Sequence, residues 1–391
     1  MEEVIKAKIQ SLIDEAIADG TTAGMSMLIR KEDEELFYIN RGYKSIEEKS
    51  EIKRDTIFRM YSMTKPITAA AAMILMEQGK LDLGQPVEDF LPGFANLQVE
   101  DKGVIRPAGK PITCHYLLNM TSGLTYGGGD TLSGRMIEEY LQECQDKMFT
   151  DRAVTTEEFA NHIGSIPLAY DPDSSFSYGL SADILGAVIE KVSGMRFGEF
   201  LDKYLFVPLG MADTGFWVPK EKQHRLANAY EMAEKGSMKP YTGNYLLISH
   251  TMEQPPAFES GGAGLVSTID DYSRFTQMLL NGGSLNGVRI MSKETVRFLT
   301  SGGLNMEQQK ALEQWVGLEG YTYSHFMRRV CDTGRTSGLS REEEYGWDGW
   351  LGCYFANFPK EQMTILMMQQ RKDAGTIPLT RKLRNTLLTS L

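Results

Sequence analysis

The sequence predicts an α+β fold, in which one antiparallel sheet is built from both ends of the chain, is flanked by helices and holds a mostly helical inserted domain. Strand-like runs occur near the N-terminus, at residues 25–29 and 35–40, and near the C-terminus, at 351–357 and 363–369. Between them, apolar residues recur mainly at helical spacing. Pairing the terminal strands in one sheet is the simplest assembly that buries their apolar faces.

The first eighty residues predict a helix, a hairpin and a second helix. Residues 4–19 have apolar side chains at helical spacing and are followed by Gly20. The polar residues 31–34 separate the first two strands as a hairpin turn. The second helix starts near Ser62 and ends at Gln78-Gly79, where the glycine suits a C-cap.

Capping residues mark the later helices. Thr155 and Glu158 fit a capping box, and that helix stops at Gly164. Further helices are predicted from Ser181 to Gly194, from Thr268 to Gly282, from Ser292 onward and over the last fifteen residues. We therefore divide the chain into a sheet domain, residues 1–80 and 255–391, and a mostly helical domain, residues 81–254.

Composition and charge exclude one class of partner. The chain has 391 residues and a formal net charge of −11, with no visible basic face. Because phosphate binding needs such a face, no nucleic-acid partner is expected. Oligomeric state is not indicated by any sequence feature.

Cysteine, histidine and hydropathy patterns predict neither a metal site nor a membrane span. The four cysteines form no C-x-x-C pair, so we expect free buried thiols. The five histidines lack ligand spacing, and no metal or cofactor is expected. The N-terminus lacks the basic and apolar regions of a signal peptide, and the most apolar stretch, residues 67–76, is too short to span a bilayer. We therefore expect a cytoplasmic protein.

The serine–lysine pair Ser62 and Lys65 is the strongest chemical signal. A serine hydroxyl needs an adjacent base to become a nucleophile. Three residues apart on a helix, the two side chains are neighbours, and burial of the lysine would favour its neutral, basic form. The spacing alone is weak evidence, since Ser50 and Lys53 share it within a charged stretch that we interpret as a surface loop. Only Ser62 opens an apolar helix.

The surrounding sequence resembles the class C β-lactamase and penicillin-binding-protein superfamily of serine hydrolases. Residues 58–65, Phe-Arg-Met-Tyr-Ser-Met-Thr-Lys, resemble its nucleophile segment. Other segments match in the same order and cover most of the chain: 83–92, 112–124 and 261–275. This resemblance implies the α/β fold with a helical domain and a covalent acyl-enzyme on Ser62.

A second family motif is a tyrosine that acts as the general base or assists it. Tyr178, followed by Gly179 and Leu180, stands at its place. Leu180 replaces an asparagine that helps the lactamases hold the amide side chain of their substrates. The alternative is that Tyr178 is an ordinary half-buried tyrosine. Whether Lys65 or Tyr178 is the base stays open at this point, as it does in related enzymes.

The third family motif, Lys-Thr-Gly, is absent. In its place, Gly346-Trp347-Asp348-Gly349 resembles the Gly-Trp-x-Gly form of family VIII carboxylesterases. The resemblance implies that Trp347, Asp348 and Gly349 contact substrate, with Asp348 repelling anions. It also implies that the backbone N–H groups of Ser62 and Trp350 form the oxyanion hole. The alternative is that Trp347 and Trp350 only fill space by packing.

Tyr126 resembles a tyrosine that lines the substrate pocket in the esterase branch. Without the lysine and the asparagine that recognise a lactam, the resemblance favours a carboxylesterase that cleaves small acyl esters. A β-lactamase, a D-Ala-D-Ala peptidase acting on an amide and an acyltransferase remain as alternatives. An alternative of another class is a non-catalytic penicillin-recognising protein.

Overall fold

A single eight-stranded antiparallel sheet forms the centre of the protein. The computed structural model describes residues 2–129, 131–315 and 317–390. In spatial order the strands are β12 (Tyr321–Ser324), β13 (Met327–Val330), β14 (Tyr345–Asp348), β15 (Tyr354–Phe358), β16 (Met363–Met368), β1 (Gly24–Lys31), β2 (Glu34–Ser45) and β3 (Ser50–Glu51).

The two ends of the chain meet inside this sheet. β1 pairs with β16, so that Ser26 lies opposite Met368 and Lys31 opposite Met363. The prediction of one antiparallel sheet made from both termini is confirmed. Its topology matches the β-lactamase-like fold class that the sequence indicates.

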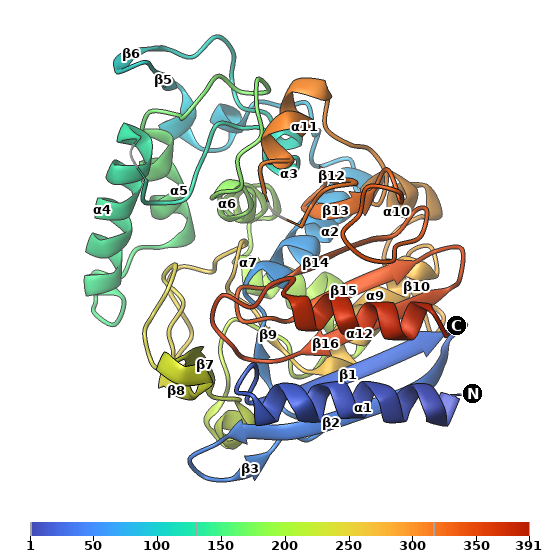
Figure 1. Ribbon diagram of the computed structural model, residues 1–391. Coiled ribbons are helices and arrows are strands. Elements are labelled where there is room, and N and C mark those ends of the chain that lie inside the picture. The colour runs from blue at the N-terminus through green and yellow to red at the C-terminus, as the bar shows by residue number, and fades with distance from the viewer. Residues whose placement is uncertain (1, 130, 316, 391) are drawn as a thin grey trace.

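Both faces of the sheet are buried, and alternate residues of each strand point to opposite faces. On β1, Met25, Met27 and Ile29 pack in a cluster with α1 (Glu2–Ala18) and α12 (Pro378–Leu388). Leu28 faces the other way, into the main core. Figure 1 shows α1 and α12 side by side across one face of the sheet.

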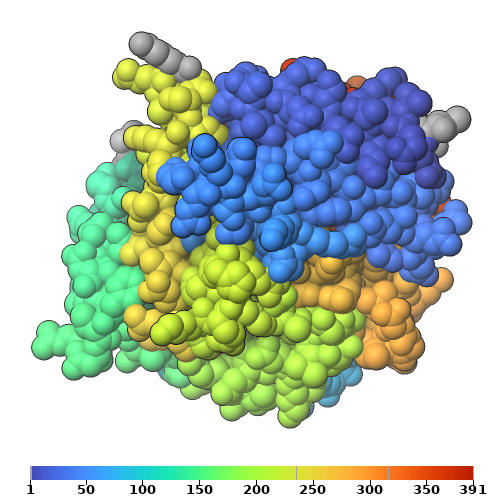
Figure 2. Space-filling model, turned by 90° about the horizontal axis from the view of Figure 1, so that it is seen from below, coloured from blue at the N-terminus to red at the C-terminus, as the bar shows by residue number. Residues whose placement is uncertain are grey.

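The opposite face is covered by α2 (Thr64–Glu77) and α9 (Ile269–Leu280), which are almost entirely buried. The remaining helices are α3 (Cys114–Leu118), α4 (Leu132–Lys147), α5 (Thr156–Gly164), α6 (Ser181–Ser193), α7 (Phe197–Leu201), α8 (Val207–Leu209), α10 (Lys293–Leu299) and α11 (Met306–Leu312). In the view from below, the N-terminal elements and the α4 region occupy different sides of the molecule (Figure 2).

Short two-stranded sheets accompany the helices: β4 (Phe58–Arg59) with β9 (Val266–Ser267), β5 (Gln98–Asp101) with β6 (Val104–Pro107), β7 (Ala229–Met232) with β8 (Met238–Tyr241), and β10 (Ser284–Leu285) with β11 (Val288–Arg289). Residues 81–254 thus contain α3 to α8 and two of these small sheets. The domain boundaries at 80 and 255 stay a prediction.

Most predicted helix ends are confirmed. Thr155 and Glu158 form the expected capping box, and Gly194 caps α6 in the left-handed conformation. Two predictions need correction. Ser50 lies on the short edge strand β3, not in a loop, and the strand predicted from residue 351 begins at Tyr354.

All four cysteines are free thiols, but Cys331 is exposed while the other three are buried as expected. Among the described residues, no helix is long and apolar enough to cross a membrane. The same part of the chain contains no cluster of three or more potential metal ligands.

Candidate active site

The nucleophile turn precedes α2. Ser62 lies in a single 3-10 turn, Tyr61–Met63, directly before Thr64 begins the α-helix. The backbone of Tyr61 has a φ of +44°, a strained value for a bulky residue. The turn is tied to a neighbouring loop, because the Met60 N–H donates to the Leu265 carbonyl at 2.8 Å.

Lys65 is fully buried, and its ammonium group has three acceptors. Nζ lies 3.2 Å from Ser62 Oγ, 3.0 Å from the Tyr126 hydroxyl and 2.8 Å from the Gly262 carbonyl oxygen. These contacts use all three N–H donors of a protonated lysine. When Lys65 is neutral, one contact must reverse, so the Ser62 hydroxyl can donate to its lone pair.

The environment of Lys65 favours that neutral form. Burial lowers the pKa of Lys65 to about 7, although the negative charges of Asp183 and Asp348 partly oppose this shift. A substantial fraction of Lys65 is therefore unprotonated near neutral pH, while an exposed lysine would be almost fully charged.

Tyr178 lies over the same lysine and beside the nucleophile. Its ring centre is 4.6 Å from Lys65 Nζ, and its hydroxyl oxygen accepts a hydrogen bond from Trp347 Nε1 at 3.0 Å. Burial raises the pKa of Tyr178, against hydrogen bonds with Ser62 and Trp347 that lower it. The phenol therefore stays protonated at neutral pH and is suited to donate a proton.

Sequence reasoning missed the group that supports Lys65 from behind. The carboxylate oxygen Oδ1 of Asp183, on α6, accepts from Ser260 Oγ at 2.5 Å and from the Gly262 N–H at 3.1 Å. The Gly262 carbonyl then points to Lys65. A side chain at position 262 would lie 2.6 Å from Asp183 Oδ2, so the contact requires glycine. The sequence contains these residues in separate segments and gives no sign that they meet.

The end of β14 lies against the nucleophile turn. A Cβ at Gly349 would be 2.3 Å from the Met60 carbonyl oxygen, so the two backbones are in direct contact. The side chain of Trp350 packs edge-on against Tyr61, with ring centres 5.0 Å apart, and its Nε1 donates to Asp373 at 2.7 Å. Among the described residues, the backbone N–H of Trp350 has no hydrogen-bond acceptor.

A cavity of about 420 Å³ opens onto Ser62. It is lined by Tyr61, Ser62, Tyr126, Tyr178, Tyr245, Leu246, Trp315, Gly317, Leu318, Trp347, Asp348, Trp350, Asp373, Gly375, Thr376 and Ile377. Of the residues singled out in the sequence, Leu180 and Gly349 do not line it. Leu180 is 2% exposed and packs in the main core, so its predicted contact with substrate lacks a surface in this cavity.

Asp348 reaches the cavity but is not a free carboxylate. Its Oδ2 accepts from Thr376 Oγ1 at 2.5 Å and lies 3.5 Å from Nη1 of the buried Arg328. Burial raises the pKa of Asp348, while Arg328, Thr376 and Lys65 oppose that shift. Pairing with Arg328 weakens the repulsion of anions that we expected from this side chain.

A buried lysine against a serine hydroxyl, at the start of a helix that covers an antiparallel sheet, defines the class of β-lactamase-like serine hydrolases. The chain belongs to the Beta-lactamase family, whose profile matches residues 9–386.

Known relatives fall within this class. Protein Rv1367c of Mycobacterium tuberculosis is 31% identical over 378 residues, covering 93% of this chain and 89% of that protein. Esterase EstB of Burkholderia gladioli is 28% identical over 285 residues, 69% of each chain. The solved structure of EstCE1, a hydrolase with promiscuous acyltransferase activity, aligns with a TM-score of 0.82 over 99% of both chains at 23% identity.

Proposed function

We propose that the protein is a carboxylesterase that cleaves small acyl esters through an acyl-enzyme on Ser62. The observation that supports this best is the contact of Lys65 Nζ with Ser62 Oγ at 3.2 Å, in a site where burial lowers the pKa of Lys65 to about 7. Esterase activity in the relative EstB agrees with this proposal.

In the first step, neutral Lys65 takes the proton of Ser62 while Oγ attacks the ester carbonyl carbon. We assign the base to Lys65 because burial raises the pKa of Tyr178, which makes a phenolate costly at neutral pH. The negative charge on the carbonyl oxygen is held by the backbone N–H groups of Ser62 and Trp350. The missing acceptor for the Trp350 N–H among the described residues supports this role.

In the second half of acylation, the carbon–oxygen bond to the leaving alcohol breaks. Tyr178 gives its proton to that alcohol and is reprotonated by Lys65, since it lies beside both Ser62 and Lys65. Water then attacks the acyl-enzyme with the same groups acting in reverse order. The products are a carboxylic acid, an alcohol and free Ser62.

The cavity favours neutral esters over lactams and peptides that bear a carboxylate. None of the described residues that line it is lysine, arginine or histidine, and two are aspartates. A substrate carboxylate would therefore lose its hydration without gaining a direct ion pair. Seven of the lining residues are tyrosine or tryptophan, which suit uncharged groups.

An acyltransferase is the second candidate, because the structural neighbour EstCE1 is described as having promiscuous acyltransferase activity. Transfer would use the same acyl-enzyme, with an alcohol in place of water. A β-lactamase, a D-Ala-D-Ala peptidase and a non-catalytic penicillin-recognising protein are alternatives that the experiment below separates.

The test is turnover of p-nitrophenyl acetate, p-nitrophenyl butyrate and nitrocefin by the wild type and two variants. Ester turnover should exceed nitrocefin turnover and vanish in Ser62→Ala. In Tyr178→Phe, kcat should fall by about 10²–10⁴-fold, the usual contribution of a positioned acid or base. Nitrocefin turnover above ester turnover would favour a lactamase, and undiminished turnover in Ser62→Ala would refute the mechanism.

Tyr323→Phe is the matched control for Tyr178→Phe. Tyr323 is a fully buried tyrosine whose ring centre lies 6.4 Å from that of Tyr178, and its hydroxyl has no partner among the described residues. Removing an unpaired hydroxyl should leave kcat unchanged. Equal losses in both variants would assign the effect to packing and not to proton transfer.

A further inference from the structure

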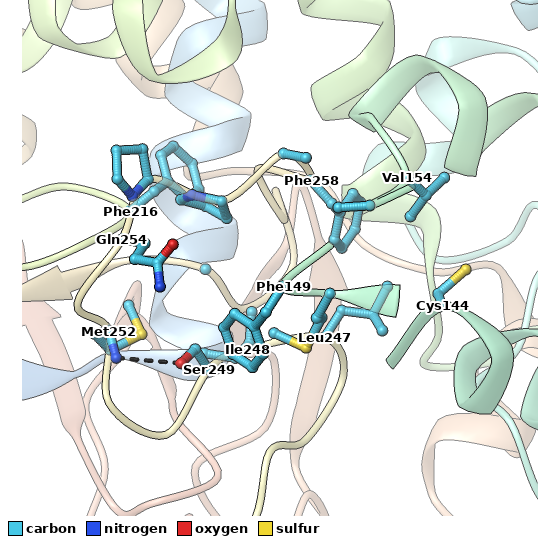
Figure 3. A pocket seen from close by; sticks show the side chains of 16 residues that line it. Cys144, Phe149, Val154, Phe216, Leu247, Ile248, Ser249, Met252, Gln254 and Phe258 are labelled. Atoms are coloured by element: carbon cyan, nitrogen blue, oxygen red, sulfur yellow. Dashed lines mark hydrogen bonds between the residues drawn. The ribbon is translucent and has the colours of Figure 1, made fainter. Parts of the chain in front are cut away.

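A second, apolar pocket lies behind one wall of the catalytic cavity. Figure 3 shows the sixteen residues that line it, among them Phe149, Val154, Phe216, Leu247, Met252 and Phe258. None of these sixteen is charged, and the pocket encloses about 60 Å³. At about 30 Å³ for a group the size of a water molecule, this space takes roughly two methylene groups.

The wall between the two cavities is a two-residue turn. Leu246 lines the catalytic cavity, and its neighbour Leu247 lines the apolar pocket. Tyr245 and Ile248 close the turn, since each accepts a backbone hydrogen bond from the other, at 3.0 and 3.3 Å. The two cavities are thus separated by the thickness of a single turn.

This turn has an unfavourable sequence for its conformation. Leu246 and Leu247 have φ values of +53° and +60°, the pair of positive angles that a type I′ turn requires. Asn-Gly is strongly preferred there, because β-carbons are strained at positive φ. Two leucines place apolar side chains on opposite sides of the wall at the cost of that strain.

The apolar pocket also adjoins the loop that holds Lys65. Gly264 lines it, two residues after the Gly262 carbonyl that contacts Nζ. The pocket therefore has one boundary shared with the catalytic cavity and another shared with the loop that supports the catalytic lysine.

We propose that the apolar pocket is an accessory site for the aliphatic end of the substrate's acyl group, which passes the Leu246–Leu247 turn from the catalytic cavity. This inference rests on the proposed esterase function. It assigns the preferred substrates to esters of medium-length aliphatic acids, because an uncharged lining rewards burial of methylene groups and offers nothing to a charged end.

The test compares acyl chain lengths in wild type and in variants that fill or enlarge the pocket. With p-nitrophenyl acetate, butyrate, hexanoate and octanoate, each methylene that enters the pocket should raise kcat/KM about fourfold. Ala257→Leu fills the pocket at a residue that does not line the catalytic cavity. It should lower the preference for the longer esters by about tenfold and leave acetate turnover within about twofold.

Leu247→Ala acts in the opposite direction. It removes the wall side chain from the pocket, so the optimum should move to a longer ester. Thr251→Leu is the matched control, because Thr251 is exposed on the same segment and does not line the pocket. Its chain-length profile should equal that of the wild type.

Identical profiles in wild type, Ala257→Leu and Leu247→Ala would overturn the accessory site. A Thr251→Leu profile that changes like that of Ala257→Leu would also overturn it, since the effect would then belong to the segment as a whole. If Ala257→Leu loses acetate turnover, Ala153→Leu fills the pocket from the other side and decides in its place. Absence of any Ser62-dependent acetate turnover would instead refute the proposed esterase function.

Discussion

At the residue scale, the site depends on one lysine that the fold keeps out of water. An exposed Lys65 would be protonated at neutral pH and could not accept a proton from Ser62. Burial disfavours the charge, while the contacts with Ser62, Tyr126 and Gly262 hold Nζ in place. Asp183 acts through Gly262 and by its charge, which makes it a positioning residue that also tunes the lysine.

A pH profile tests this assignment. Because Lys65 must be neutral to act, kcat/KM should rise with pH through a midpoint near the pKa of about 7 and then level off. The charge of Asp183 raises the pKa of Lys65, so Asp183→Asn should move the midpoint to lower pH. The ratio of kcat/KM at pH 6 to that at pH 8 should increase about threefold, the effect of roughly 1 kcal/mol of lost attraction.

Glu190→Gln is the control for that profile. Glu190 is on the same helix and accepts a hydrogen bond from the Phe197 N–H at 2.9 Å, away from Lys65. Its profile should match the wild type. The other groups that face Lys65 are Asp348, Tyr126 and Tyr178, and none of them changes in either variant. An unchanged midpoint in Asp183→Asn would remove Asp183 from the tuning of the base.

At the element scale, catalysis depends on how closely the end of β14 approaches the turn before α2. Gly349 permits this approach, since a β-carbon there would meet the Met60 carbonyl oxygen at 2.3 Å. Gly349→Ala should push the strand end and the Trp350 N–H away from Ser62. We expect kcat to fall by about 10²-fold or more, as for the loss of one oxyanion donor.

The matched control is Gly84→Ala, where the nearest atom to a new β-carbon is Asp82 Oδ1 at 3.4 Å. This variant should keep full activity in the same ester assay. Normal kcat in Gly349→Ala would exclude this strand end from oxyanion binding.

Elements with strong local signals could be predicted from the sequence, and others could not. Capping residues and apolar spacing marked α5, α6 and α9 to within about two residues. The hairpin of β12 and β13 was not predicted, because its two-residue turn is His325-Phe326, with positive φ at both and no glycine. Burial in the core stabilises this turn, and a local sequence pattern does not report burial.

The same limit applies to the site. Ser62, Lys65, Tyr178 and Trp347 belong to local motifs, and the structure places them together. Asp183, Ser260 and Asp373 come from separate segments and acquire a role only when the chain is folded. Contacts between distant segments depend on the tertiary fold.

At the scale of the whole molecule, the C-terminal helix and the sheet hold the two ends of the chain in one unit. Arg384 on α12 donates to both carboxylate oxygens of Glu344, at 2.7 and 2.9 Å, and these side chains are 5% and 1% exposed. Arg384 also bonds the Tyr354 hydroxyl on β15. Removing one partner of such a pair leaves an uncompensated buried charge.

Arg384→Ala should therefore lower the free energy of unfolding by about 3–5 kcal/mol, measured by urea denaturation, without changing the pH profile of the remaining folded enzyme. Arg297→Ala is the control, since its pair with Glu294 is exposed and should contribute less than about 1 kcal/mol. Equal losses of stability in the two variants would contradict the role of the buried pair.

The central claim is that Ser62, activated by Lys65, forms the covalent intermediate. The most direct measurement is peptide mass mapping after reaction with an activated organophosphate, diethyl p-nitrophenyl phosphate. We predict one diethyl phosphoryl group on the peptide that contains Ser62, formed much more slowly in Lys65→Met and absent in Ser62→Ala. A label on another residue, or equal labelling of the Ser62→Ala protein, would contradict the account.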